Sequence, residues 1–107
     1  MSALGELETL VLLAILRLGG ETYGVPVRDE IETRTGRRLT RGAIYTALAR
    51  LEKKNYLDST VGPPTPMRGG KAKRFYSVSG LGMETLRGST RVMERMRAGL
   101  EALFIDK

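Results

Sequence analysis

The first part of the chain carries hydrophobic residues at the spacing of a helix. One apolar stripe runs along it, because its members recur at intervals of three and four residues. The stripe consists of Leu7, Leu10, Val11, Ala14 and Leu18. Leucine and isoleucine also fill most of the remaining circumference of the second half, and Gly19-Gly20 supplies a helix stop. The pattern predicts a helix over 4–19 that is buried on more than one side.

Two shorter helices are predicted next, joined by the connection 36–39. The segment 24–35 has Pro26 in its first turn, where the missing N–H costs nothing. The segment 41–54 has Thr40 as its N-cap and only a narrow apolar stripe, so its other faces are polar and basic. Two helices joined by a tight turn, the second of them amphipathic, are typical of a helix-turn-helix.

Alternating hydrophobic positions replace the helical pattern after residue 56. Two alternating runs, 57–61 and 74–78, predict antiparallel strands, and the segment 62–73 between them contains three prolines and three glycines. A hairpin with a basic tip directly after a helix-turn-helix predicts a wing over 57–78. The expected fold is therefore mostly α with a small β-hairpin, a winged helix-turn-helix domain over residues 1–79.

A last helix is predicted from about 80 to 105, capped by Ser79, although three glycines weaken it. At 1.5 Å per residue it would span ~38 Å, and its distal half would leave apolar side chains in water unless a second copy covered them. We therefore expect residues 80–107 to be an added C-terminal dimerisation helix of a homodimer. The heptad-like seam and its neighbours predict an interface of Leu86, Met93, Met96, Leu100, Leu103 and Phe104.

The positive charge of the chain is concentrated in one block. The net charge of +6 divides into −3 over residues 1–36, +8 over 37–74 and +1 over 75–107. A clustered basic face favours a polyanionic partner, since neutralised phosphates release condensed counterions. A basic surface that only serves solubility is the alternative interpretation.

The residue types that are absent exclude several kinds of site. The chain has no histidine and no cysteine, which excludes histidine acid–base catalysis, a Ser-His-Asp triad, disulfides and thiolate metal sites. The acids Asp29, Glu30 and Glu32 are interpreted as a solvated helix face. We expect no enzyme activity, no metal and no cofactor. The apolar run 10–16 is far shorter than the ~20 residues that cross a bilayer, so we expect a cytoplasmic protein with no membrane partner.

Four segments together resemble the PadR family of bacterial winged-helix transcriptional regulators. They are "LETLVLLAIL", "TYGVPVRDEIE", "RGAIYTALARLEKKNYL" and "GGKAKRFYSVSGLG", in that order, within residues 4–87. The short C-terminal part is similar to the compact members, whose single terminal helix dimerises. The resemblance implies a homodimer whose third helices enter successive major grooves of a near-palindromic operator in double-stranded DNA, usually to repress a nearby gene.

The resemblance also implies which residues contact DNA. In and beside the recognition helix they are Thr40, Arg41, Gly42, Tyr45, Thr46 and Arg50, with Tyr23 at the start of the second helix. In the wing they are Arg68, Gly69, Gly70, Lys71, Lys73 and Arg74. The family's "YGYEI"-like motif is "YGVPV" here, so contacts made by its second aromatic residue are not expected.

Two questions stay open from the sequence. The same basic face could serve a winged-helix module that binds RNA or an acidic protein without operator specificity, and monomeric behaviour would favour that alternative.

Some members of the family bind flat hydrophobic compounds between subunits, and Met83, Met93 and Met96 could line such a site for a small hydrophobic effector. Plain packing of the dimer core is the simpler interpretation of these methionines.

Overall fold

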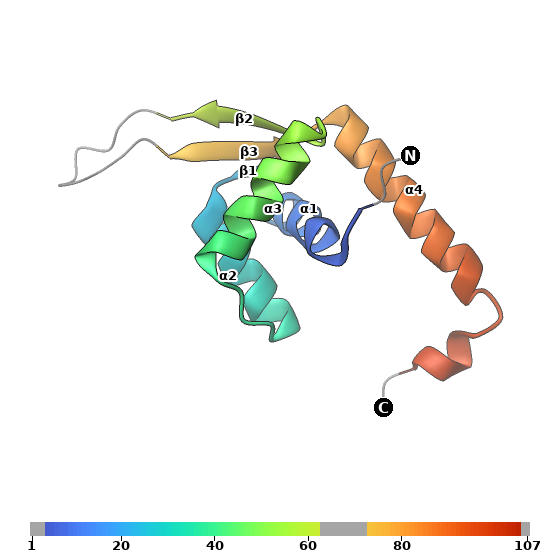
Figure 1. The fold of residues 1–107 in the computed structure, drawn as a ribbon. Coiled ribbons are helices and arrows are strands. Elements are labelled where there is room, and N and C mark those ends of the chain that lie inside the picture. The colour runs from blue at the N-terminus through green and yellow to red at the C-terminus, as the bar shows by residue number, and fades with distance from the viewer. Residues whose placement is uncertain (1–3, 63–72, 106–107) are drawn as a thin grey trace.

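The fold is a body of three helices with a three-stranded sheet on one side and a fourth helix that extends away from it (Figure 1). The computed structural model describes residues 4–62 and 73–105. Its elements are α1 (Glu6–Arg17), β1 (Glu21–Thr22), α2 (Gly24–Thr35), α3 (Arg41–Lys53), β2 (Leu57–Val61), β3 (Arg74–Val78), α4 (Gly80–Arg97) and a 3-10 helix (Glu101–Phe104). The three predicted helices and the predicted hairpin strands are confirmed.

The core lies where α1 meets α2, α3 and the sheet. Its largest fully buried side chains are Val11, Leu12, Ile15, Val27, Ile44, Leu48, Leu51 and Leu57. The narrow stripe predicted on the third helix is therefore its core face. On α1, Leu13 and Leu16 stay exposed on the single chain, so the side that was predicted to face something other than the helix's own core is not covered within the described residues. The apolar circumference of α1 thus has one side in the core and one side free.

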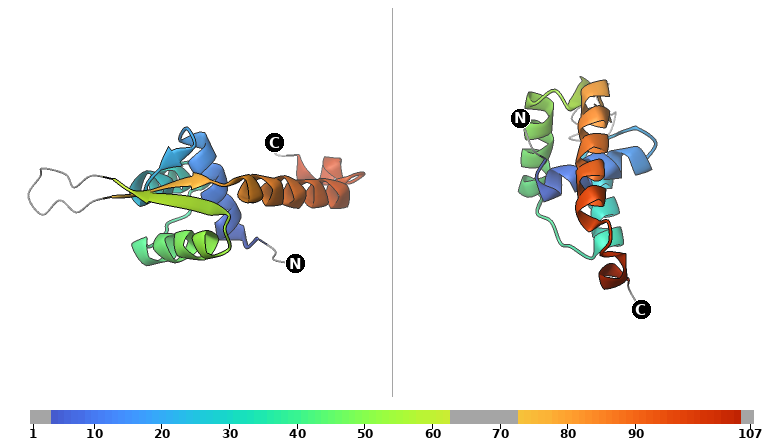
Figure 2. Two further views of the ribbon diagram at one scale, coloured as in Figure 1. Left: turned by 90° about the horizontal axis from the view of Figure 1, so that it is seen from above. Right: turned by 90° about the vertical axis from the view of Figure 1, so that its right-hand side faces the viewer.

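The sheet has the strand order β1-β3-β2, with both pairings antiparallel. The two hairpin strands pair from Leu57 opposite Val78 to Val61 opposite Arg74. Strand β1 was not predicted, since two residues carry no periodic signal. It ties the chain between α1 and α2 to the inner strand of the hairpin. Figure 2 shows that the hairpin and α4 leave the helical body in opposite directions.

The junction between α3 and α4 is tightly bonded. Ser79 caps α4 as predicted: its Oγ accepts from the Gly82 N–H at 2.9 Å and donates to the Asn55 carbonyl at 2.7 Å. The Ser79 N–H donates to the Tyr56 carbonyl at 3.0 Å. Gly82 lies against that same carbonyl, where a Cβ would come within 2.2 Å of the oxygen. Only glycine lets α4 begin this close to the end of α3.

The prediction of one continuous helix to residue 105 is wrong. Helix α4 ends at Arg97, and Gly99 adopts a left-handed φ of 87°, so the chain turns before the short 3-10 helix. The 18 residues of α4 correspond to ~27 Å rather than ~38 Å. Leu86, which was included in the predicted dimer interface, is only 5% exposed and packs in the core of its own chain. It is therefore not available to a second copy.

A partly buried ion pair joins the first turn of α1 to the C-cap of α3. Glu8 accepts from the Lys54 ammonium at 2.9 Å and from the Gly5 N–H at 2.8 Å, and its side chain is only 12% exposed. Burial raises the pKa of Glu8, but the Gly5 and Lys54 hydrogen bonds together outweigh it and hold the pKa below its ordinary value. The pair therefore stabilises the fold with Glu8 ionised.

The close approach at Gly82 predicts that alanine substitutions at Gly82 and Gly88, both in α4, change the free energy of unfolding differently. We expect Gly82→Ala to lower the free energy of unfolding by about 1–3 kcal/mol, because a backbone carbonyl must move to admit the new methyl group. Gly88→Ala is the matched control: its Cβ meets nothing within 4 Å, so alanine should stabilise by up to ~1 kcal/mol. Urea denaturation measures both, and equal effects would contradict the packing.

The ion pair predicts a pH-dependent effect of Glu8→Gln. A carboxyl with a lowered folded-state pKa stabilises above its ordinary pKa, and that stabilisation is lost as pH falls through the lowered value. We expect Glu8→Gln to cost about 1–2 kcal/mol at neutral pH, and the difference from wild type to shrink below pH ~4. Glu84→Gln, on the exposed surface of α4, is the control. Thermal unfolding across pH tests this, and a difference independent of pH would count against it.

Candidate nucleic-acid interface

An open hollow lies where the first turn of α2, the outer face of α3 and the start of β3 meet. Its lining combines two tyrosines with three cationic side chains. The lining residues are Tyr23, Gly24, Val25, Arg41, Tyr45, Lys73 and Arg74. Residues from three separate parts of the sequence are thus brought to one surface, and five of them were predicted to contact DNA.

The predicted recognition-helix residues share one exposed face of α3. Thr40 is the N-cap, as predicted, and its Oγ1 accepts from the Ala43 N–H at 3.0 Å. The other five are all exposed, namely Arg41, Gly42, Tyr45, Thr46 and Arg50. A side chain at Gly42 would meet nothing within 4 Å, so the helix surface is bare there. This face is free to approach a partner closely.

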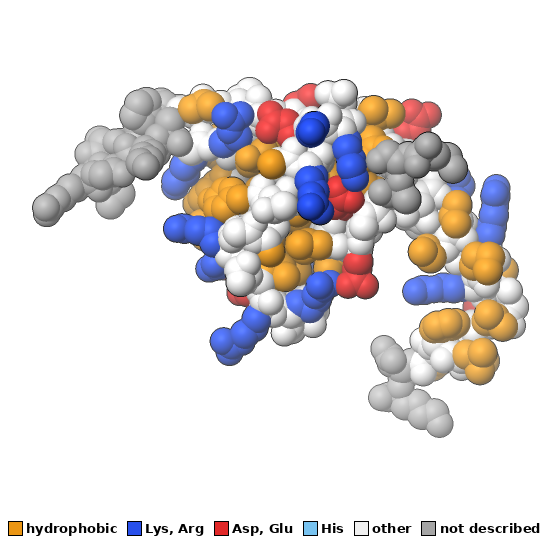
Figure 3. All heavy atoms as spheres, in the orientation of Figure 1, with side chains coloured by type: hydrophobic (Ala, Val, Ile, Leu, Met, Phe, Trp, Pro, Cys, Tyr) orange, Lys and Arg blue, Asp and Glu red, His pale blue; other side chains and the backbone are white. Residues whose placement is uncertain are grey.

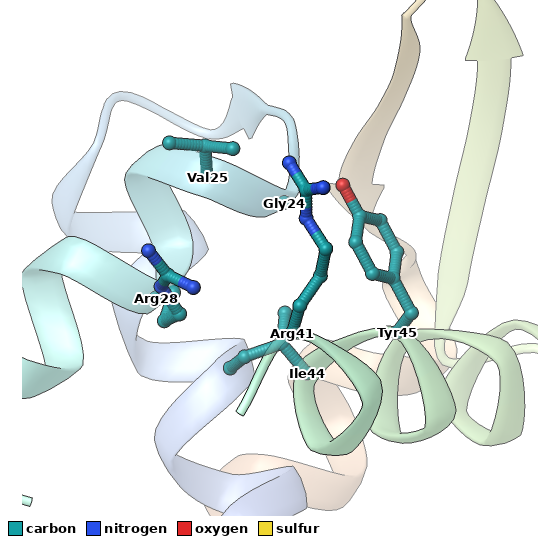
Figure 4. A pocket seen from close by; sticks show the side chains of 6 residues that line it. All are labelled: Gly24, Val25, Arg28, Arg41, Ile44 and Tyr45. Atoms are coloured by element: carbon teal, nitrogen blue, oxygen red, sulfur yellow. The ribbon is translucent and has the colours of Figure 1, made fainter. Parts of the chain in front are cut away.

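Tyr45 lies directly over the first turn of α2. A Cβ at Gly24 would come within 2.9 Å of the Tyr45 ring, so glycine lets the ring settle against the α2 backbone. The ring is still 43% exposed, which agrees with the prediction that Tyr45 stands off the apolar stripe. Figure 4 shows the side chains of Arg41 and Tyr45 extending together from α3 toward α2.

Arg28 belongs to the same surface and was missed in the sequence. It lines a small pocket with Arg41, Ile44 and Tyr45 (Figure 4). Its Nε is buried and has no hydrogen-bond partner among the described residues, and it lies 4.0 Å from the Asp29 carboxylate. The spacing in the sequence could have indicated this position, because Arg28 is four residues after Gly24 and therefore lies on the same face of the helix.

At the start of α2 the backbone N–H groups of Gly24 and Val25, which line the hollow, have no partner within the helix, while the next residue, Pro26, has no N–H. Its N-cap, Tyr23, makes no side-chain hydrogen bond to the helix, and the first turn contains no acidic residue. The first N–H groups of a helix have no partner within the helix, and they attract anions when no side chain caps them. The first turn of α2 therefore suits a negatively charged group.

The cationic residues at the start of β3 differ in their surroundings. The Lys73 ammonium lies over the Tyr23 ring, 4.4 Å from its centroid. Arg74 instead donates to Ser59 Oγ at 2.9 Å, and its guanidinium lies 3.8 Å from the Glu52 carboxylate. Arg74 is thus partly engaged by its own sheet and by α3. The predicted wing-tip residues Arg68, Gly69, Gly70 and Lys71 lie outside the described residues.

Lys and Arg side chains predominate on the side of the molecule that carries α3 and the start of the wing (Figure 3). Several acids elsewhere are neutralised locally: Glu30 accepts from Arg34 at 2.6 Å and Arg17 at 3.1 Å. These two hydrogen bonds lower the pKa of Glu30.

Within residues 4–62 and 73–105, no group of three or more potential ligands could hold a metal ion. No helix in the described part of the chain is long and apolar enough to cross a membrane.

Comparison with known protein families shows the family of the chain. The model of the transcriptional regulator PadR-like family matches residues 12–88. The chain belongs to the PadR-like family of transcriptional regulators. The match covers α2, α3 and the hairpin, and the resemblance noted in the sequence is confirmed. The family is one of transcription regulators, not of enzymes.

Solved structures share the fold of this PadR-like chain at low sequence identity. A transcriptional regulator from Clostridium thermocellum is 24% identical, with a TM-score of 0.71 over 92% of each chain. A PadR family transcription regulator from Clostridium difficile is 20% identical, with a TM-score of 0.76 over 94% of this chain and 100% of the other. F93 from STIV, a winged-helix DNA-binding protein, is 15% identical, with a TM-score of 0.70 over 89% and 95%. The predicted winged helix-turn-helix is confirmed. No curated protein matches the sequence.

Proposed function

We propose that this PadR-like regulator is a cytoplasmic repressor that binds a near-palindromic DNA operator as a homodimer. The exposed face of α3, cationic and aromatic and flanked by the hollow, is the observation that carries the proposal. An amphipathic helix that presents such a face beside a wing fits the major groove of B-DNA, with its N-terminal residues nearest the base edges.

Arg41 is the residue that we assign to base reading. It lies in the first turn of α3, is exposed, and stands beside Tyr45 at the rim of the hollow. A guanidinium at that position can donate two hydrogen bonds to O6 and N7 of a guanine. Bare Gly42 next to it allows the helix to enter the groove without a steric barrier.

The groups around Arg41 are assigned to the DNA backbone. Arg28 lines the small pocket and Lys73 lines the hollow, and both spaces are also lined by Gly24 and Val25 in the first turn of α2, whose N-cap makes no side-chain hydrogen bond. Together they offer two charges and backbone donors to a phosphate, a combination that fixes register without reading sequence. Arg50, further along α3, is assigned to a phosphate for the same reason.

The dimer proposal rests on the apolar surface of the C-terminal segment. Its exposed members are Val92, Met93, Met96, Leu100, Leu103, Phe104 and Ile105, the most open being Leu103 at 77% and Met96 at 73%. Figure 3 shows hydrophobic side chains gathered on this segment. Exposed Leu13 and Leu16 on α1 extend the apolar surface of the protein. To read two successive major grooves, a dimer formed through these groups has to hold its two α3 helices one turn of DNA apart, ~34–36 Å. A hydrophobic effector between the subunits stays a prediction.

The variant Arg41→Ala tests whether Arg41 contributes to sequence preference as well as to the electrostatic attraction of DNA. Binding is measured to a duplex from the regulator's own promoter and to a scrambled duplex, across a salt series. We expect wild type to prefer the promoter strongly, and Arg41→Ala to reduce that preference by about 1–3 kcal/mol. Arg28→Ala should weaken both duplexes alike and lower the salt slope by ~0.9.

The matched control is Lys53→Ala, which removes one exposed charge from the last turn of α3, away from the hollow. It should change the preference for the promoter by much less than Arg41→Ala. If both duplexes bind wild type alike and fade together with salt, the basic face is not a reader of operators. Binding of RNA or of an acidic protein would then be the better account.

Met96→Glu tests the dimer. A carboxylate on the exposed apolar face of α4 should weaken self-association by about 2 kcal/mol or more, because the interface would have to bury a charge. Arg91→Glu, on the opposite side of the same helix by its spacing, should leave association nearly unchanged. Sedimentation equilibrium measures both variants. A wild-type protein that stays monomeric at micromolar concentrations would contradict the dimer.

A further inference from the structure

A cluster of four residues joins α2 to both strands of the wing. We name Tyr23, Gly62, Lys73 and Phe75 the wing-base cluster. The rings of Tyr23 and Phe75 meet edge to face, with centroids 5.7 Å apart and planes at 69°. Because Tyr23 caps α2 while Phe75 lies on β3, this contact fixes the first turn of α2 against the strand that leaves the wing.

The strand that enters the wing is held by the same cluster. The Gly62 N–H donates to the Lys73 carbonyl at 2.8 Å, one position beyond the last pair of β2 and β3. A Cβ at Gly62 would come within 2.9 Å of the Phe75 ring. Residue 62 therefore has to be a glycine for the ring to close over the base of the wing.

Lys73 is the cationic member of the cluster, and its position depends on Tyr23. Its ammonium lies 4.4 Å from the centroid of the Tyr23 ring, within the range of a cation–π contact. A lysine side chain otherwise samples many rotamers. An ammonium seated on one ring face still has N–H donors that point away from the ring. Lys73 can therefore bind a phosphate without leaving Tyr23.

We propose that Tyr23 is a positioning residue, which acts on DNA by holding Lys73 and the wing base in place rather than through a contact of its own hydroxyl. This inference rests on the proposed function, since it assigns how one phosphate contact of the DNA site is prepared. It changes the role that the family resemblance implied for Tyr23, from a direct DNA contact to a support of the neighbouring lysine. The consequence is a wing whose distance from α3 is set before DNA arrives.

A double-mutant cycle on operator affinity tests the coupling. We expect Lys73→Gln to weaken binding about fivefold and to lower the salt slope by ~0.9, as one lost phosphate contact does. Tyr23→Leu should weaken binding by a similar or smaller factor, and the double variant no more than Lys73→Gln alone. Tyr23→Phe keeps the ring and should bind like wild type. In the control cycle Arg50→Gln, at the separate phosphate contact assigned on α3, replaces Lys73→Gln, and its loss and that of Tyr23→Leu should multiply.

A second readout needs no DNA. The ε-carbon of Lys73 is bonded to the ammonium that lies over the Tyr23 ring, so we expect the NMR signals of its protons to be shifted upfield in the free protein. Tyr23→Leu should abolish the shift, while Tyr23→Phe should preserve it. Thermal unfolding of each variant establishes that the fold is intact.

Three results would overturn the inference. Tyr23→Phe could bind as weakly as Tyr23→Leu, which would make the hydroxyl a direct contact. The losses of Tyr23→Leu and Lys73→Gln could multiply, which would make the two residues independent. The upfield shift could be absent from the wild type. If instead no duplex binds the wild type at all, the proposed function fails, while the NMR signals still report on the coupling between Tyr23 and Lys73.

Discussion

The first turn of α2 lies so close to α3 that the ring of Tyr45 occupies the space a side chain at residue 24 would need. This contact decides where the exposed face of α3 stands relative to the rest of the domain. The preceding residue, Tyr23, occupies the N-cap position of α2, and its ring meets Phe75 on β3. Two adjacent residues thus join α2, α3 and the wing. The ring of Tyr45 lies between the first turn of α2 and α3, and it forms part of the lining of the hollow.

Not every basic residue in the sequence is free at the surface to bind a partner. The block 37–74 carries a net charge of +8, yet several of its cations are used inside the fold. Lys54 binds Glu8, Arg37 binds Glu6, and Arg74 is held by Ser59 near Glu52. The cations that line the hollow include Arg41 and Lys73, and Arg28, from outside the block, lines the small pocket next to Arg41. The sequence shows where the basic residues are concentrated. The ion pairs and hydrogen bonds of the fold then determine which of these basic side chains are free to bind a partner.

The spacing of apolar residues predicted α1, α2, α3 and the hairpin, because each of these elements buries one face and periodicity reports burial directly. The same reasoning failed at the C-terminal end. Leu100 and Leu103 continue the seven-residue spacing of α4, but Gly99 takes a left-handed conformation and the helix has already ended. Arg28 was missed for a different reason. Its place in the site depends on Arg41 and Tyr45, which lie more than a dozen residues away in the chain.

The bonds at the junction of α3 and α4 leave little slack between these helices. Ser79 is bonded to Asn55 and Tyr56, and Gly82 touches the Tyr56 carbonyl, so the first turn of α4 is held against the short turn that directly follows α3. A rotation of α4 would therefore carry α3 with it instead of being absorbed in a loop. The C-terminal arm is thus a lever whose rotation passes toward α3 through these contacts.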